Sequence, residues 1–298
     1  VGLTWQASTE HNIYGSYSES SRAPTPIELA CNEGVFELAM QYAIADGEDP
    51  NDVDFECRLP NAFLADPPLN DVIAKSFELG VRGFISELNY SLGLFNTTNT
   101  DDILFQTTGR STGLFANVDK TRRSGVETSL RGKTQSIDWV FSYSYINATF
   151  EDDFAVLSPN HNFADDEGKI SVSNGDRIPG IPQNQFKILL DYDFVNGLNL
   201  GLDITSNDSQ IIRGDESNQL NEVDGYTVAS LRARYSLNEN LEIFARVNNL
   251  FDEEFETFGL LGEEPSEIGL PLFDEMDIPI FLGAGAPRAA FLGLRYSF

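Results

Sequence analysis

Apolar and polar residues alternate along most of the chain with a period of two. In residues 186–194 every second position is apolar, namely Phe186, Ile188, Leu190, Tyr192 and Phe194. Successive side chains of a β-strand point to opposite faces, so this pattern predicts strands with one apolar and one polar face. It predicts about eleven strands, at residues 1–8, 11–19, 76–84, 87–97, 114–133, 137–150, 185–195, 197–208, 224–237, 240–251 and 288–298. A helix is expected only within 26–42.

Short and long connections alternate between these strands. Short polar turns are expected at 8–10, 84–86, 132–135, 196–197 and 238–240, and long acidic loops at 20–75, 98–113, 151–184, 209–223 and 252–287. Segment 98–113 is ambiguous, because its residues 103–106 (Ile-Leu-Phe-Gln) also suit a strand extension. Long loops at one end of the strands and short turns at the other are typical of outer-membrane β-barrels.

The predicted fold class is therefore all-β, an antiparallel transmembrane β-barrel, with residues 1–298 as one domain. Counting back from a last strand that ends in the periplasm, the strands would be the C-terminal half of a barrel of about 22, a size that holds a plug in its lumen. Val1 opens directly onto a strand, so we expect a longer protein. Such a half-barrel should be an open, curved sheet with unpaired edges near 1–8 and 288–298.

Charge and hydropathy narrow the possible classes of protein. Lys and Arg number 19 against 47 Asp and Glu, and the formal net charge of −28 would repel nucleic acid. No apolar run reaches the roughly 18–20 residues of a membrane-spanning helix. Solvated charge explains the acidic loops. Calcium binding by clusters such as 165–167 and 274–277 is the alternative, although none has the spacing of a known calcium loop.

Two cysteines, Cys31 and Cys57, lie in the first long loop with no histidine nearby, which disfavours a metal site. A disulfide between them would place the loop in an oxidising compartment, such as the periplasm or the cell surface. It would limit the unfolded chain by about 3–4 kcal/mol in the entropy model. Two unpaired thiols are the alternative.

The last predicted strand carries an apolar face that ends at the final residue. This face consists of Ala290, Leu292, Leu294, Tyr296 and Phe298. A terminal strand that ends in an aromatic residue resembles the signal read by the barrel-assembly machinery of Gram-negative bacteria. We therefore expect that machinery to be a partner of the chain.

Five segments resemble, in order along the chain, the barrel motifs of TonB-dependent outer-membrane receptors. They are 17–29, 75–82, 123–131, 248–259 and 285–288. Residues 248–259 (NNLFDEEFETFG) resemble the family's N-L-F-D-x-x-Y motif, with Phe255 in place of the commoner Tyr. Residues 285–288 (GAPR) resemble the G-x-P-R approach to the terminal strand, and 17–29 resemble the segment that contains F-R-A-P-x-x-x-E-L.

The resemblance implies a barrel of about 22 strands filled by an N-terminal plug, in the outer membrane of a Gram-negative bacterium. It implies import of a scarce ligand, such as a siderophore, cobalamin or a glycan, which binds at extracellular loops and plug apices. TonB would pull on the plug with energy from the proton gradient, and the barrel wall would contact lipid. The plug and its TonB box are expected outside this chain, and no ligand-contacting residue stands out.

Enzymatic chemistry is not expected, and no catalytic residue, cofactor or metal is assigned. His11 follows a predicted periplasmic turn, and His161 lies in a long loop with Ser158 and residues 165–167. These Ser, His and acidic side chains have the residue types of a hydrolytic triad. No predicted strand or helix would hold them in the geometry that a triad needs. Two other interpretations stay open. One is a passive outer-membrane channel or surface-binding barrel without energy coupling, and the other is a soluble acidic β-sandwich.

Overall fold

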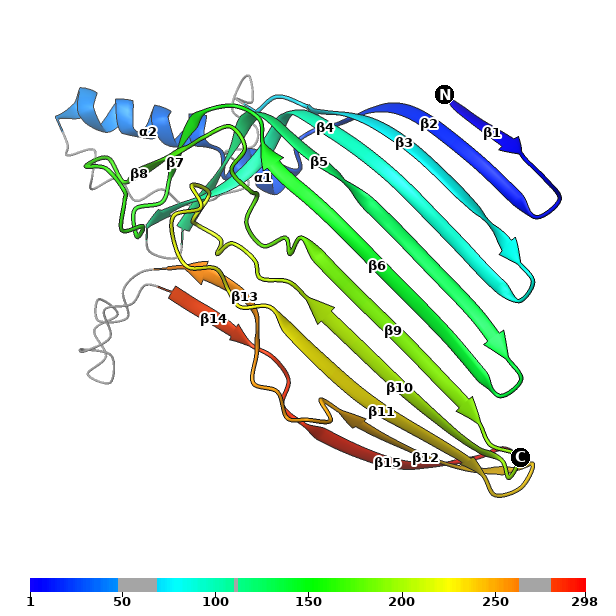
Figure 1. The fold of residues 1–298 in the computed structure, drawn as a ribbon. Coiled ribbons are helices and arrows are strands. Elements are labelled where there is room, and N and C mark those ends of the chain that lie inside the picture. Colours follow the sequence, from blue (N-terminus) through cyan, green and yellow to red (C-terminus); the bar gives the residue numbers. More distant parts are fainter. Residues whose placement is uncertain (48–68, 110–111, 263–279) are drawn as a thin grey trace, which may run out of the picture.

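A computed structural model describes residues 1–47, 69–109, 112–262 and 280–298. In these residues eleven strands form one antiparallel sheet, in the order β1-β2-β3-β4-β5-β6-β9-β10-β11-β12-β15 (Figure 1). Their bounds are β1 Gly2–Gln6, β2 His11–Arg22, β3 Val72–Ile85, β4 Leu88–Gly109, β5 Thr112–Thr134, β6 Ile137–Phe150, β9 Asn184–Asp193, β10 Leu198–Asn207, β11 Tyr226–Ser236, β12 Leu241–Asn248 and β15 Ala289–Tyr296. The sheet is curved and open, with β1 and β15 at its edges, which confirms the expected architecture.

One face of the sheet is apolar across neighbouring strands. Phe141 of β6 lies opposite Ile188 of β9, which lies opposite Ile204 of β10. Large side chains on this face stay exposed, including Leu190 at 38% and Leu292 at 79%. Such a face suits lipid rather than water. Among the described residues no second large sheet packs against it, whereas a soluble β-sandwich would cover such a face with one.

Tight turns join the strands at one end of the sheet, as expected. Ser86, Gln135 and Gly197 have φ values of 55°, 42° and 84°, the left-handed conformation that tight hairpin turns require. Two of the turns are shorter than predicted, because β3 continues to Ile85 and β5 to Thr134. The sequence does not fix the exact bounds of these two turns, because neither has a glycine at its left-handed position.

The hairpin of β4 and β5 extends far beyond the other strands. Its pairing runs from Leu88 opposite Gly132 to Gly109 opposite Thr112. The expectation of a long loop at 98–113 is therefore wrong, and the alternative, a strand extension, is confirmed. Asp102 stabilises the extension, since it accepts hydrogen bonds from the Thr121 hydroxyl at 2.6 Å and from Arg123 at 3.2 Å.

The expected helix at 26–42 is two helices, α1 Pro26–Ala30 and α2 Glu33–Asp46. Thr25 begins α1, because its hydroxyl accepts the Glu28 N–H while the Glu28 carboxylate accepts the Thr25 N–H. This capping box satisfies N–H groups that the helix leaves unpaired. Neither described helix is long and apolar enough to span a membrane.

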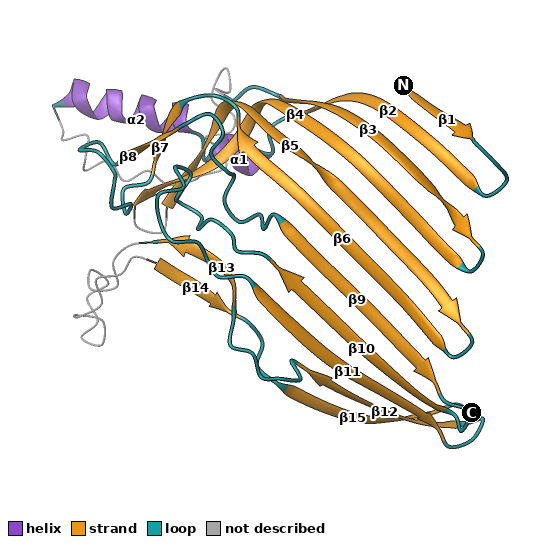
Figure 2. Cartoon of the chain, viewed as in Figure 1, coloured by secondary structure: helices purple, strands orange, loops and turns teal. Residues whose placement is uncertain are grey.

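Two small hairpins lie within the long connections, where the sequence predicted only loops. They are β7 Phe154–Leu157 with β8 Lys169–Val172, and β13 Glu256–Leu261 with β14 Ile280–Ala284. Both lie at the end of the sheet opposite the tight turns (Figure 2). We call residues 151–183, 209–223, 256–262 and 280–284, with the tip of β4 and β5, the loop cluster.

Two buried apolar groups of residues lie in or against the loop cluster. One comprises Phe150, Val156, Ile170 and Val172, and the other Ile212, Val223 and Leu261. The wide sheet itself buries few of its large apolar side chains, many of which stay exposed. The loops therefore pack against one another and form a cap at one end of the sheet.

Candidate functional site

Segment 209–223 lies at the centre of the loop cluster and bonds to two other connections. Its Arg213 N–H donates to the Gly259 carbonyl at 3.0 Å, and the Leu261 N–H donates to the Arg213 carbonyl at 2.8 Å. On another side, the Gly180 N–H donates to the Ile211 carbonyl at 3.0 Å. These backbone bonds fix segment 209–223 between β13 and the connection that leads into β9.

A buried pair, His161 and Asp215, joins two of the long connections. The Nδ1 of His161 accepts the Phe163 N–H at 3.1 Å, so the imidazole proton is on Nε2, which lies 2.9 Å from Asp215 Oδ1. Asp215 also accepts the backbone N–H groups of Gln219 and Leu220. Both side chains of the pair are at most 1% exposed.

The partners of this pair show whether His161 and Ser158 could act together as part of a hydrolytic triad. His161 meets Asp215, not residues 165–167, and Ser158 donates its hydroxyl to the Gly214 carbonyl at 2.6 Å. The groups are held in place, contrary to the expectation for free loops. Because Ser158 is 2% exposed and its proton is committed to a carbonyl, the arrangement fastens loops together and does not present a nucleophile to a base.

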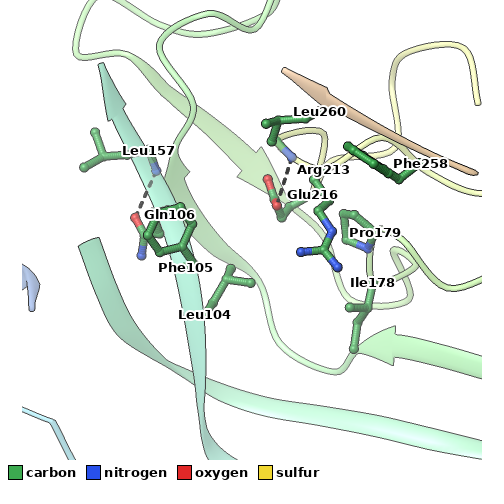
Figure 3. Close-up of a pocket in the computed structure, with 11 residues that line it drawn as sticks. Leu104, Phe105, Gln106, Leu157, Ile178, Pro179, Arg213, Glu216, Phe258 and Leu260 are labelled. Atoms are coloured by element: carbon green, nitrogen blue, oxygen red, sulfur yellow. Dashed lines mark hydrogen bonds between the residues drawn. The ribbon is translucent and has the colours of Figure 1, made fainter. Parts of the chain in front are cut away.

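A cavity of about 710 Å³ lies in the loop cluster, within the range typical of small-molecule sites. Its apolar lining consists of Leu104, Phe105, Leu157, Ile178, Pro179, Phe258 and Leu260. Gln106, Arg213, Gly214 and Glu216 complete the lining. The lining residues come from β4 and from three connections between strands of the large sheet (Figure 3). None of them was identified from the sequence, because loop residues so far apart carry no shared period.

The cavity has two ionisable side chains of different character. Arg213 is exposed and makes no side-chain hydrogen bond or ion pair with a described residue, and Figure 3 shows its guanidinium extending into the cavity. Glu216 is 6% exposed and accepts the Gly214 N–H at 3.3 Å. Burial raises the pKa of Glu216 to about 7, and the neighbouring charge of Asp215 adds to the rise.

The segments that resemble family motifs form clasps at the bases of loops. Asn249, buried and at φ 49°, donates its side-chain amide to the carbonyls of Glu253 at 2.9 Å and Ala286 at 3.1 Å. Beside it, Asp252 accepts the Arg288 N–H at 3.0 Å. The two motifs thus hold together the ends of the connection between β12 and β15.

Two sequence predictions remain predictions. Cys31 is 4% exposed at the end of α1, and Cys57 lies outside the described residues, so their disulfide is not tested. Of the proposed assembly signal, Ala290, Leu292, Leu294 and Tyr296 share one face of edge strand β15, opposite Val247, Ala245, Ile243 and Leu241, and Phe298 follows the strand.

In the part of the chain that the structure describes, no group of three or more His, Cys, Asp or Glu could hold a metal ion.

Comparison with known proteins agrees with this geometry. Residues 1–250 match the family model described as "TonB dependent receptor-like, beta-barrel". The chain is 27% identical over 250 residues to the ferric-pyoverdine 358 receptor of Pseudomonas putida, covering 80% of this chain and 26% of the relative. It is also 27% identical over 261 residues to the probable TonB-dependent siderophore receptor PiuA of Acinetobacter baumannii, covering 86% of this chain and 30% of the relative.

Solved structures share the fold. The siderophore receptor PiuA from Acinetobacter baumannii superposes with a TM-score of 0.66 at 19% identity, over 99% of this chain and 35% of that one. The ferric yersiniabactin uptake receptor FyuA from Yersinia pestis gives 0.65 at 16% identity, over 100% and 36%. The chain thus spans about a third or less of the length of these proteins.

The open sheet with one lipid-suited face and a packed cap of loops is part of an outer-membrane β-barrel of the receptor class. The chain belongs to the TonB-dependent receptor β-barrel family. It is located in the Gram-negative outer membrane, with the long loops outside the cell.

Proposed function

We propose that the protein containing this chain imports a ferric siderophore through the outer membrane, with energy supplied by TonB. The observation that carries this proposal is the match of residues 1–250 to the receptor barrel, together with two relatives named as siderophore receptors that align over 80% and 86% of the chain. The cavity in the external loops supports it, because a receptor of this kind must first capture a dilute ligand at the cell surface.

The partners follow from the same proposal. TonB would act through a part of the protein that this chain does not include, and the barrel-assembly machinery would read the face of β15. The apolar face of the sheet would contact lipid. The protein would carry out no covalent chemistry, since the buried His161–Asp215 pair holds loops rather than a substrate.

Growth under iron limitation tests the import proposal. A strain lacking the gene should fail to grow on at least one ferric siderophore, with ferric pyoverdine and a ferric catecholate as the first probes. The intact gene should restore growth, but not in a strain that also lacks TonB. Equal growth with and without TonB would support the passive channel instead, and unimpaired growth of the deletion strain on every siderophore would reject the import proposal.

A further inference from the structure

The cavity in the loop cluster is lined by apolar side chains together with a few polar ones, and this combination fits one chemical class of ligand. We propose that this cavity is an external recognition site for an anionic chelate with an aromatic body, and that Arg213 binds the anionic group. This proposal rests on the proposed import function. The argument depends on the state of Arg213, on how its side chain is placed and on the surfaces around it.

Arg213 is an unneutralised cation in a strongly acidic protein. The chain carries 47 acidic and 19 basic residues. Of the three arginines in the described segments between strands, Arg177 pairs with Glu222 and Arg288 with Asp252. Arg213 has no such partner among the described residues. A planar guanidinium is well suited to pairing with a carboxylate or another anion. Its charge is available to a ligand.

The position of Arg213 is fixed by its surroundings. Its backbone bonds to Gly259 and Leu261 on β13. Its side chain crosses Gly180, where a Cβ atom would lie 3.1 Å from the Arg213 Nε and where φ is 75°. A larger residue at 180 would be strained and would crowd the arginine. Arg213 is therefore anchored at its backbone and its side chain lies against Gly180, which lowers the entropy cost of binding.

Aromatic surface faces the same space. Phe105 of β4 and Phe258 of β13 are 53% and 49% exposed, and Leu260 is 40% exposed. The two exposed rings favour a ligand that stacks on them and covers them. A small inorganic anion would leave this surface wet, so the ligand class is aromatic as well as anionic.

Glu216 is the remaining ionisable group of the lining. Its carboxyl group is buried against the Gly214 N–H, whereas its neighbour Asp215 is committed to His161. With its pKa raised to about 7 by burial, Glu216 is largely neutral in slightly acidic medium, and Arg213 is then the only charge that the lining presents. In such a medium the cavity therefore favours anions over cations.

The test uses the intact receptor, purified in detergent, with two ferric probes of similar size. One is the anionic complex of Fe(III) with 2,3-dihydroxybenzoate, and the other is ferrichrome, a neutral trihydroxamate chelate. Binding is followed by quenching of intrinsic fluorescence. R213Q should weaken binding of the anionic probe at least about tenfold, the usual scale for a hydrogen bond to a charged group, and R213K should recover part of it. F258A should also weaken binding.

K169Q is the matched control, since it removes the same charge from a partly exposed site on β8 outside the cavity lining. It should leave the affinity unchanged. Gel mobility of unheated samples confirms that each variant is folded. Equal affinity in R213Q and wild type, preference for ferrichrome, or no binding of the anionic probe by wild type would overturn the proposal. If growth on a ferric siderophore still requires the gene and TonB, import stands and only the cavity assignment fails.

Discussion

His161 Nε2 donates a hydrogen bond to Asp215 Oδ1 at 2.9 Å, joining two residues that lie 54 positions apart in the sequence. Each comes from a different external connection, and each is shielded from water. The carboxylate that receives this bond also caps the backbone turn at Gln219 and Leu220. One contact thus couples the β7–β8 hairpin to the segment that carries Arg213 and Glu216.

Removing the imidazole should loosen this coupling. H161A leaves a buried carboxylate short of one donor, so we expect roughly 2–3 kcal/mol of local destabilisation. Hydrogen exchange measured by mass spectrometry on the intact receptor should accelerate in 209–223. H11A is the control, because His11 contacts Tyr90 near the tight turns and not in the loop cluster. Unchanged exchange of 209–223 in H161A would show that the pair does not fasten the loops.

Burial of Glu216 predicts a pH dependence of the same loops. Its pKa in the folded protein is raised from 4.5 to about 7, so the folded loops favour the protonated form. That contribution is complete below about pH 4.5 and is lost as the pH rises through about 7, a change of roughly 3 kcal/mol. Local opening of 209–223, corrected for intrinsic exchange, should be greater at pH 8 than at pH 5.

E216Q should remove this dependence, because a neutral amide replaces the titrating group with little change in shape. E167Q removes a carboxylate that is 75% exposed on the neighbouring loop, and it should leave the pH dependence as in the wild type. The same pH slope in E216Q and wild type would assign the effect to another group.

The Asn249 clasp should contribute measurably to barrel stability. N249G keeps the left-handed backbone at φ 49° without strain but removes the bonds to Glu253 and Ala286. We expect a loss of roughly 1–3 kcal/mol, seen as a lower temperature for the gel-mobility shift of the barrel. N249A should lose about 1 kcal/mol more, because alanine resists this conformation. If both variants shift at the wild-type temperature, the motif has another role.

The apolar face of β15 predicts an assembly defect. F298S removes the aromatic side chain that follows β15, which ends at Tyr296. The amount of heat-modifiable receptor in outer membranes should fall several-fold. V195S is the control, since Val195 is an equally exposed apolar residue beside a tight turn. Normal assembly of F298S would show that the Phe298 side chain is not read as a signal.

The sequence reveals the barrel wall because lipid and lumen impose a period of two on each strand. For β9, this period alone places Leu190 on the apolar face and Lys187 on the polar face. That period is lost where both faces meet water, which is why the polar run Thr97–Thr100 of β4 looks like a loop. The cap escapes prediction for a further reason. Contacts such as His161 with Asp215, or Arg213 with Gly180, depend on how separate loops pack, and no local pattern records that packing.

Accumulation of radioactive iron by intact cells is the most direct test that this receptor performs energised import. Cells whose only outer-membrane siderophore receptor is the intact protein would be given a labelled ferric siderophore, with and without a protonophore. We predict that collapse of the proton gradient stops accumulation inside the cells but leaves surface binding in place. Accumulation that continues unchanged without the gradient would contradict TonB-driven import and would identify the barrel as a passive channel.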